Sequence, residues 1–274
     1  IVFSDSINTV SEKYAQEICN DKEFAVGLLD VLSKRKKDMF GIINGIDGSI
    51  WNPEKDKKIV KKYSVKNIED KILNKQALAD KFGFECKENV PVIGMISRLY
   101  DSKGFDLVEK AFPDLMKLNM HLVLLGTGDK KYHKFFEHAV MKNGKKFSCY
   151  LGFDDELAHL IEAGADMFLM PSKYEPCGLN QMYSLVYGTV PIVRDTGGLS
   201  DTVENFNEKT GNGNGFVFSK YNAADMLKEV KRAINIFTDD PKTWIKIMKA
   251  GMKNNFTWLN SSKNYIEVYK KVVG

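Results

Sequence analysis

Long hydrophobic runs and a strong charge imbalance are both missing from this sequence. No apolar stretch approaches the roughly 18 residues that a membrane-spanning helix needs, and the start of the chain shows no signal-peptide pattern. The 40 Lys and Arg exceed the 36 Asp and Glu by only four, which argues against a protein that binds nucleic acid mainly through its charge. We therefore expect a soluble, cytoplasmic protein that binds neither membranes nor nucleic acid.

Paired cysteines and the common metal and cofactor motifs are also missing. The four cysteines lie far apart without C-x-x-C spacing, which predicts free thiols in a reducing compartment. The four histidines have no metal-ligand spacing, and no G-x-x-x-x-G-K-[ST] loop occurs. Gly126-Thr127-Gly128 resembles half of a dinucleotide-binding fingerprint, but Lys131 stands where the third glycine belongs. The sequence thus predicts no metal site and no cofactor.

From about residue 90 onward, short apolar runs alternate with amphipathic stretches of helical period. The runs are apolar at consecutive positions, which is typical of strands covered on both faces. They begin roughly 20 to 30 residues apart, about the length of a strand plus a crossover helix. We predict strands at 92–96, 121–125, 147–151, 167–170, 190–193 and 216–218. The alternation predicts a doubly wound α/β domain with a parallel sheet and helices on both faces.

The flanks of this region differ from it. Ser11 precedes a stretch that predicts a capped helix, and we interpret 34–37 as a solvated charge run. After the last strand we expect helices at 223–237, 242–252 and 258–273. Because the first residue is Ile rather than Met, we expect that the chain was cut from a longer protein.

Polar residues follow the first predicted strand. In an open parallel sheet, ligands bind at the carboxyl ends of the strands. Arg98 and Lys103 lie on either side of the first strand-to-helix turn. There they can converge on one diphosphate, the arginine with a forked contact and the lysine as a point charge. Two unrelated surface cations explain the spacing equally well.

The turn after the fourth strand carries a carboxylate and a helix start. Glu175 precedes a proline at the mouth of the sheet, which directs its carboxylate into the cleft. The backbone N–H groups of Gly178, Leu179 and Asn180 then face an anion, favoured by the helix dipole. The alternative for Glu175 is a helix-capping charge. Cys177 has no histidine nearby in the sequence and is more typical of a buried small residue than of a nucleophile.

Two further turns offer weaker signals. Thr196 is followed by Gly197 and Gly198, which allow a backbone to approach a ligand closely, although a tight turn alone also explains them. Phe153 follows the third strand, where its ring either stacks on a flat base or packs against a loop.

Together these turns resemble one family, the bacterial glycogen synthases and plant starch synthases, which are retaining glucosyltransferases of the two-domain GT-B architecture. The resemblance covers essentially the whole chain, and its motifs occur in the family's order. They are Asn44 to Asp47 with Trp51 to Pro53, Ser97 to Leu99 with Lys103-Gly104, Pro171-Ser172 with Glu175 to Leu179, Tyr187 to Pro191, Thr196 to Val203, and Phe256 to Trp258.

The resemblance implies a role for each matching residue. Arg98 and Lys103 neutralise the diphosphate of a nucleotide sugar as the leaving group gains charge, and Glu175 orients the glucose through its hydroxyls. The amides of Leu179 and Asn180 cradle a phosphate. The remaining nucleotide-sugar-binding positions are Phe153 on the adenine, Asn44 beside the sugar, and Cys177, Gly178, Thr196, Gly197 and Gly198 along the pocket.

The same resemblance implies the activity and the domains. The protein is expected to transfer glucose from ADP-glucose to the non-reducing end of an α-1,4-glucan. Residues 1–43 are expected to end an acceptor-side N-terminal domain, 44–250 to form the nucleotide-sugar-binding Rossmann-like domain, and 251–274 to form a C-terminal helix that packs back toward the N-terminal domain. The family's Lys-x-Gly-Gly-Leu loop does not occur in the chain. We therefore expect this chain alone to bind nucleotide without turnover and to need its missing N-terminal domain as a partner.

Alternatives to this interpretation remain open. Tyr183 stands where related GT-B families carry a second glutamate, which agrees with the glycogen and starch synthase group. A nucleotide- or glucan-binding module without catalysis, or a GT-B glucosyltransferase with another acceptor, also fits the chain. Because Phe153 can stack on adenine or uracil, the choice of ADP comes from the resemblance alone.

Overall fold

A parallel sheet of six strands forms the centre of the protein, whose computed structural model describes residues 1–273. The strand order is β5-β4-β3-β6-β7-β8, and every neighbouring pair is parallel. The strands are β3 (Val92–Ile96), β4 (His121–Gly126), β5 (Phe147–Leu151), β6 (Met167–Met170), β7 (Val190–Arg194) and β8 (Phe216–Phe218). The six predicted strands are confirmed, with β4 and β7 each one residue longer at the end.

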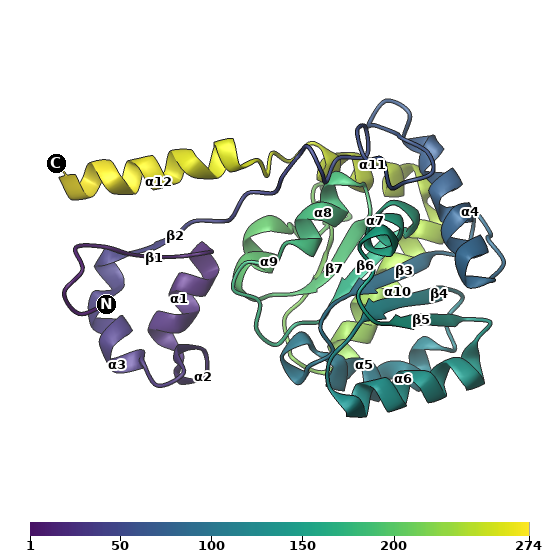
Figure 1. The fold of residues 1–274 in the computed structure, drawn as a ribbon, viewed down its shortest axis with the longest axis horizontal. Coiled ribbons are helices and arrows are strands. Elements are labelled where there is room, and N and C mark those ends of the chain that lie inside the picture. The colour runs from purple at the N-terminus through teal and green to yellow at the C-terminus, as the bar shows by residue number, and fades with distance from the viewer. Residues whose placement is uncertain (274) are drawn as a thin grey trace.

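Helices cover both faces of this sheet (Figure 1). Alternate residues of β3 enter different cores, with Ile93 on one face and Val92 on the other, which explains the unbroken apolar run. The helices α5 (Phe105–Leu115), α6 (Lys130–Asn143), α10 (Ala223–Asp239) and α11 (Pro241–Met252) supply the first core. The second core receives α4 (Lys71–Phe82) and α7 (Asp155–Gly164). The doubly wound α/β fold is therefore confirmed.

The strand order reverses between β3 and β6. From β3 the chain adds β4 and β5 on one side, and β6, β7 and β8 then follow on the other side. Such a switch point leaves a crevice beyond the carboxyl ends of its two central strands, where ligands bind in this class of fold. The short helices η3 (Asp101–Lys103), α8 (Asn180–Val186) and α9 (Gly197–Thr202) follow β3, β6 and β7 at this end.

An N-terminal segment, residues 1–41, has its own small core. Strands β1 (Ile7–Thr9) and β2 (Met39–Gly41) form a two-stranded parallel sheet. With them are α1 (Glu12–Asn20), α2 (Lys22–Ala25), α3 (Leu29–Leu32) and η1 (Ser33–Asp38). The cap predicted for the first helix is present, since the Tyr14 N–H donates to Ser11 Oγ at 2.8 Å.

The charge run at 34–37 is only partly solvated, contrary to expectation. Its three lysines are exposed, but the Arg35 side chain is only 18% exposed and pairs with Asp38. The same guanidinium donates to the carbonyl oxygens of Ile1 and Val2. Arg35 therefore holds the first residues of the chain in place, a contact between residues 33 or more positions apart that the local pattern does not reveal.

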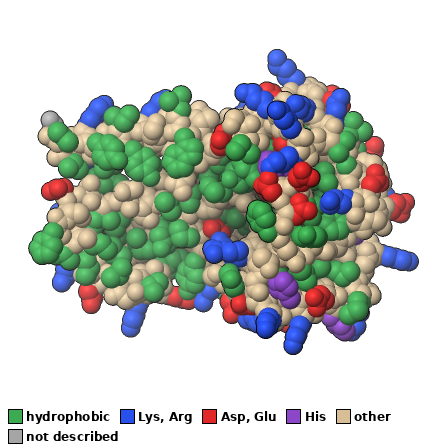
Figure 2. Space-filling model, viewed as in Figure 1, with side chains coloured by type: hydrophobic (Ala, Val, Ile, Leu, Met, Phe, Trp, Pro, Cys, Tyr) green, Lys and Arg blue, Asp and Glu red, His purple; other side chains and the backbone are tan. Residues whose placement is uncertain are grey.

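Two stretches of chain join the N-terminal segment to the rest of the protein. The Ile46 N–H donates to the Phe256 carbonyl at 2.7 Å, and Ile46 forms a parallel bridge with Thr257. Beyond this crossing, α12 (Trp258–Val273) lies along the N-terminal segment (Figure 1), where the Lys271 ammonium is 4.7 Å from the centre of the Phe40 ring. Figure 2 shows hydrophobic side chains gathered over this part of the molecule; the exposed ones include Phe3, Val26 and Leu259.

The helices of residues 1–273 include none that is long and apolar enough to cross a membrane.

Candidate functional site

The turns after β3 and β6 touch at the switch point. Gly104 has a φ of +79°, and a Cβ at this position would lie 2.0 Å from the Pro171 carbonyl oxygen. The Lys173 N–H donates to the Ser102 carbonyl at 2.9 Å. Only glycine allows this close approach, so Gly104 is what lets the two turns bring their polar side chains together.

The turn after β7 packs against the same β6 turn. The Gly198 N–H donates to the Glu175 carbonyl at 3.0 Å. A Cβ on Gly198 would lie 1.9 Å from the Cys177 carbonyl oxygen, and a Cβ on Gly197 would lie 2.0 Å from that of Glu175. Of the two interpretations open from the sequence, the structure therefore supports tight chain packing as the reason for the paired glycines.

Lys103 and Glu175 form an ion pair at the centre of these turns. The Lys103 Nζ lies 2.7 and 2.9 Å from the two carboxylate oxygens, and the Ser172 hydroxyl donates to the same carboxylate at 3.0 Å. Glu175 is only 7% exposed, so its charge needs these donors. The capping alternative for Glu175 is wrong, because its carboxylate binds these two side chains and α8 begins without a side-chain cap.

Arg98 faces a cleft beside this pair. The cleft has a volume of about 280 Å³ and is lined by residues that include Trp51, Arg98, Phe153 and Asn180. Arg98 is exposed, and its guanidinium lies 5.9 Å from the centre of the Tyr100 ring. The two cations expected to converge on one diphosphate thus have different partners in this structure, one bound to Glu175 and one at the neighbouring cleft.

Phe153 and Asn180 both line the cleft, but the first is exposed and the second is held by a hydrogen bond. The Phe153 ring is 86% exposed, so it is not packed under a loop and can accept a flat ring on its face. Asn180 is anchored, since its Nδ2 donates to the Ile96 carbonyl at 2.8 Å. That bond ties the start of α8 to the end of β3 across the switch point.

Asn44 and Cys177 contact each other through a hydrogen bond, and neither lines the cleft. Cys177 is buried in a cluster with Ile46 and Met182. Burial raises the pKa of its thiol, and a hydrogen bond from the Asn44 backbone N–H opposes this rise only in part. Cys177 therefore fits the predicted buried small residue, and Asn44 reaches it from the stretch that links the N-terminal segment to the sheet.

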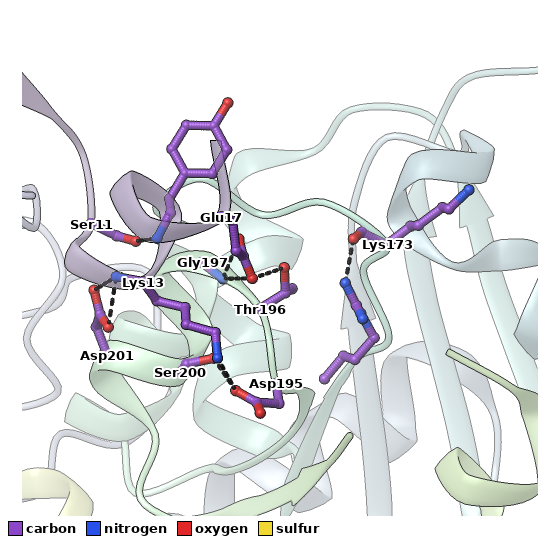
Figure 3. Close-up of polar contacts among 11 residues, drawn as sticks. Ser11, Lys13, Glu17, Lys173, Asp195, Thr196, Gly197, Ser200 and Asp201 are labelled. Atoms are coloured by element: carbon purple, nitrogen blue, oxygen red, sulfur yellow. Dashed lines mark hydrogen bonds and ion pairs between the residues drawn. The ribbon is translucent and has the colours of Figure 1, made fainter. Parts of the chain in front are cut away.

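A carboxylate that no sequence pattern marks touches Thr196 and Gly197. The Thr196 hydroxyl donates to Glu17 Oε1 at 3.1 Å, and the Gly197 N–H donates to the same carboxylate at 3.2 Å (Figure 3). Glu17 belongs to α1 in the N-terminal segment, 180 positions from Gly197. It could not be selected from the sequence, because the residues of α1 predict only an amphipathic helix.

Trp51 lines the cleft and belongs to a stack of aromatic rings that the sequence did not predict either. Trp51 lies between His159 and Tyr183, with ring centres at 3.8 and 3.9 Å and nearly parallel planes. His159 is buried and its Nδ1 lies 2.6 Å from Asp56 Oδ2. Tyr183 thus supports Trp51, a role that its position in the sequence did not suggest.

Glu162 is a fully buried carboxyl group that also lines the cleft. Burial raises its pKa to about 8. The Ser184 hydroxyl lies 2.7 Å from Glu162 Oε2 and 2.8 Å from the Asn180 carbonyl. The hydrogen bond that the Ser184 hydroxyl donates to Glu162 and the nearby Lys71 charge oppose this rise in pKa only in part. The cleft therefore has in its wall a carboxyl group whose pKa lies well above its usual range.

A larger groove lies elsewhere, between the stretch 206–211 and helices α10 and α11. Its volume is about 960 Å³. Its cations, among them Lys228, Lys231 and Lys246, are solvent-facing lysines on helices. None of the residues selected from the sequence lines it, so the switch point holds the candidate site.

Comparisons with known proteins identify the family of the chain. Residues 76–251 match the family model described as "Glycosyl transferases group 1". The chain is 46% identical over 273 residues to a glycogen synthase of Pseudothermotoga lettingae, covering 100% of this chain and 56% of that relative. It is 44% identical over 274 residues to a glycogen synthase of Bacillus cereus, covering 100% of this chain and 57% of that relative.

A solved structure gives the same result. The catalytic domain of starch synthase IV from Arabidopsis thaliana, bound to ADP and acarbose, superposes with a TM-score of 0.91 and 34% sequence identity. The match covers 99% of this chain and 56% of that one. The chain thus spans a little over half the length of the relatives that it matches.

Proposed function

The chain belongs to the glycosyl transferases of group 1, and from this premise we propose that it is the nucleotide-sugar-binding part of a glycogen or starch synthase. The family-level resemblance drawn from the motifs is thereby confirmed. The proposed reaction transfers glucose from ADP-glucose to the non-reducing end of an α-1,4-glucan with retention of configuration. The observation that carries the proposal is the buried Lys103–Glu175 pair at the switch point, beside a cleft with an exposed Phe153.

The proposed roles come from the resemblance, and the contacts of the side chains support them. Lys103 is bound to Glu175, and its charge can shift from the carboxylate toward the leaving diphosphate as the C1–O bond breaks. Arg98 supplies the second cation from the cleft. Glu175, fixed by Ser172 and Lys103, accepts hydrogen bonds from the sugar hydroxyls and holds the glucose in place.

The nucleotide and phosphate contacts are assigned on the same basis. Phe153 stacks on the adenine, while the amides of Leu179 and Asn180 face a phosphate at the uncapped start of α8. The resemblance adds Asn44, Cys177, Gly178, Thr196, Gly197 and Gly198 as proposed donor-pocket positions, although none of them lines the cleft around Phe153. The Arabidopsis starch synthase binds ADP in its solved structure, which supports adenine over uracil.

We propose that the domains divide where the chain crosses between them, near Ile46 and near Phe256. Residues 1–43 end an acceptor-side domain, 44–250 hold the nucleotide sugar, and 251–274 return to the first domain. The pairing of Ile46 with Phe256 and Thr257 supports a hinge at this point. The apolar face over the N-terminal segment and α12 (Figure 2) fits a surface that the rest of the enzyme covers.

Two further expectations follow from this division. Because GT-B sites close between two domains, the chain alone should bind nucleotide without turning over ADP-glucose. We retain the cytoplasm as the proposed location, since the four cysteines are free thiols in the structure.

Calorimetric titration of the chain with ADP, UDP and ADP-glucose tests the proposal. The variants are Arg98→Ala and Lys103→Ala, with Lys117→Ala as the control because Lys117 pairs only with the exposed Asp114. Loss of one cation from a diphosphate site should weaken ADP binding by about tenfold or more, and UDP should bind more weakly than ADP. Equal ADP affinity in all four proteins would refute the site.

A further inference from the structure

Helices α1 and α9 are far apart in the chain but each caps the start of the other (Figure 3). Asp201 of α9 accepts hydrogen bonds from the backbone N–H groups of Glu12 at 2.6 Å and Lys13 at 3.2 Å. Glu17 of α1 accepts from Thr196 Oγ1 and from the Gly197 N–H. First-turn N–H groups have no partner within their own helix, so each carboxylate satisfies donors of the opposite helix. The pairing makes the two helices antiparallel.

The two halves of this reciprocal cap differ in their surroundings. Asp201 is exposed, whereas Glu17 is half-buried. Burial raises the pKa of Glu17, against the effect of its hydrogen bonds and of the Lys13 and Arg194 charges. A half-buried carboxylate that loses its partners pays a larger desolvation penalty than an exposed one. Loss of the hydrogen bonds should therefore have a larger effect at Glu17 than at Asp201.

The turn that Glu17 holds also touches the proposed donor site. On one side, Thr196 and Gly197 donate to Glu17. On the other side, the Gly198 N–H donates to the Glu175 backbone carbonyl, and the Glu175 side chain forms the ion pair with Lys103. The turn is thus bonded to the Glu17 side chain of α1 on one side and to the backbone of the residue proposed to orient the sugar on the other.

We propose that Glu17 is a positioning residue that couples the docking of the N-terminal segment to the shape of the donor site. When α1 is docked, Glu17 fixes the Thr196–Gly198 turn, and this turn sets the backbone position of Glu175. When α1 moves away, the turn loses its partner and the donor site loosens. The inference rests on the proposed function for its consequence, but the reciprocal cap can be tested apart from it.

Three variants separate this role from a general loss of contacts. Glu17→Ala removes both hydrogen bonds, while Glu17→Gln keeps an acceptor oxygen and serves as the conservative rescue. Glu23→Ala is the matched control. Glu23 lies in α2 of the same segment and reaches across the same boundary, but it binds Lys173 and Tyr174 instead of the Thr196–Gly198 turn.

Amide hydrogen exchange without nucleotide tests the reciprocal cap. Exchange over residues 196–199 should become about tenfold faster or more in Glu17→Ala, be partly restored in Glu17→Gln, and stay at the original rate in Glu23→Ala. Peptides from β3 and β4 report whether each variant remains folded. If Glu17→Ala unfolds, the exchange rate over residues 196–199 is compared between Glu17→Gln, with its strands intact, and the original chain. Unchanged exchange over 196–199 in folded Glu17 variants would overturn the inference.

Titration of the same proteins with ADP tests the positioning role. Glu17→Ala should weaken ADP binding by about tenfold, Glu17→Gln by much less, and Glu23→Ala not at all. Equal or tighter ADP binding by Glu17→Ala would overturn the positioning role but leave the proposed function intact. Tighter binding would mean that the Glu17 carboxylate competes with an anion for the same donors. If the original chain binds no ADP, the proposed function fails for this chain and the positioning role fails with it, while the exchange rates still decide whether the cap exists.

Discussion

The turns of the sheet and the N-terminal segment meet at the same site but are held there by different forces. Among the turns, backbone lies on backbone, as where Gly104 touches Pro171 and Gly198 touches Cys177. Across the boundary to the N-terminal segment, the polar contacts are side-chain hydrogen bonds and ion pairs such as Glu17 with Gly197 and Lys173 with Glu23. They are joined there by the edge-to-face contact of Phe24 with Tyr174. Steric contacts are insensitive to salt, whereas exposed ion pairs are screened by it. We therefore call the turns of the sheet the rigid half of the site. We call the N-terminal segment, whose exposed ion pairs are weakened by salt, the detachable half.

The largest expected effect comes from a Cβ placed between two turns. Gly104→Ala puts a methyl group 2.0 Å from the Pro171 carbonyl oxygen at a φ of +79°, and should lower the free energy of unfolding by more than about 3 kcal/mol. Gly211→Ala is the control, because Gly211 has a φ of +75° with no atom nearby. It should cost only about 1 kcal/mol. Equal losses in urea titrations would show that backbone strain, and not contact between the turns, explains Gly104.

Removal of the Lys103 cation from the buried Glu175 carboxylate ranks next. Lys103→Ala leaves Glu175, which is 7% exposed, with Ser172 as its remaining side-chain donor. The loss should be about 2 kcal/mol, below the range for fully buried pairs because the Lys103 side chain is 21% exposed. Adding Glu175→Gln removes the uncompensated charge and should restore part of the stability. A double variant less stable than Lys103→Ala would argue against a charge effect.

In the rigid half of the site, the buried Glu162 should make the free energy of unfolding depend on pH. Burial raises its folded-state pKa from 4.5 to about 8, so between these values the folded protein keeps a proton that the unfolded chain releases. Stability from this group is full below pH 4.5 and is lost as pH rises toward 8. Between about pH 5.5 and 6.5, the unfolding free energy of the original chain should fall by up to about 1.4 kcal/mol relative to Glu162→Gln. Parallel pH profiles would show that Glu162 is ionised in the fold.

The smallest effect is expected in the detachable half. Glu23→Ala removes the contacts with Lys173 and Tyr174 across the boundary. Both members of the Lys173–Glu23 pair are well exposed, at 37% and 55%, so the melting temperature should not change measurably at physiological salt. A clear drop in melting temperature, persisting in high salt, would mean that the boundary is held as firmly as the turns.

The sequence predicts the rigid half of the site well because its signals are local. Consecutive apolar residues mark each strand, and the position of Glu175 after a strand and before a helix places it at the mouth of the sheet. The ion-pair partner of Glu175 is harder to predict from the sequence, because Lys103 lies 72 positions away. The spacing of Lys103 from Arg98 indicated a shared diphosphate instead. The sequence shows the paired glycines at 197 and 198, but it does not show that the carbonyl groups of Glu175 and Cys177 leave no room for a Cβ there.

The detachable half was not predictable from the same signals. Glu17 and Gly197 are 180 positions apart, and one half-buried glutamate on an amphipathic helix resembles any other. Arg35 shows the same limit, since its partners at Ile1 and Val2 are set by the folding of the whole segment. Contacts of this kind depend on how two regions dock, which no local pattern encodes.

A crystal structure of the chain with ADP tests the central claim most directly. We expect the diphosphate at the switch point between Arg98 and Lys103, with the adenine on the exposed face of Phe153 and the phosphates near the start of α8. ADP in the groove beside α10 and α11, or bound without contact to Arg98 and Lys103, would contradict it.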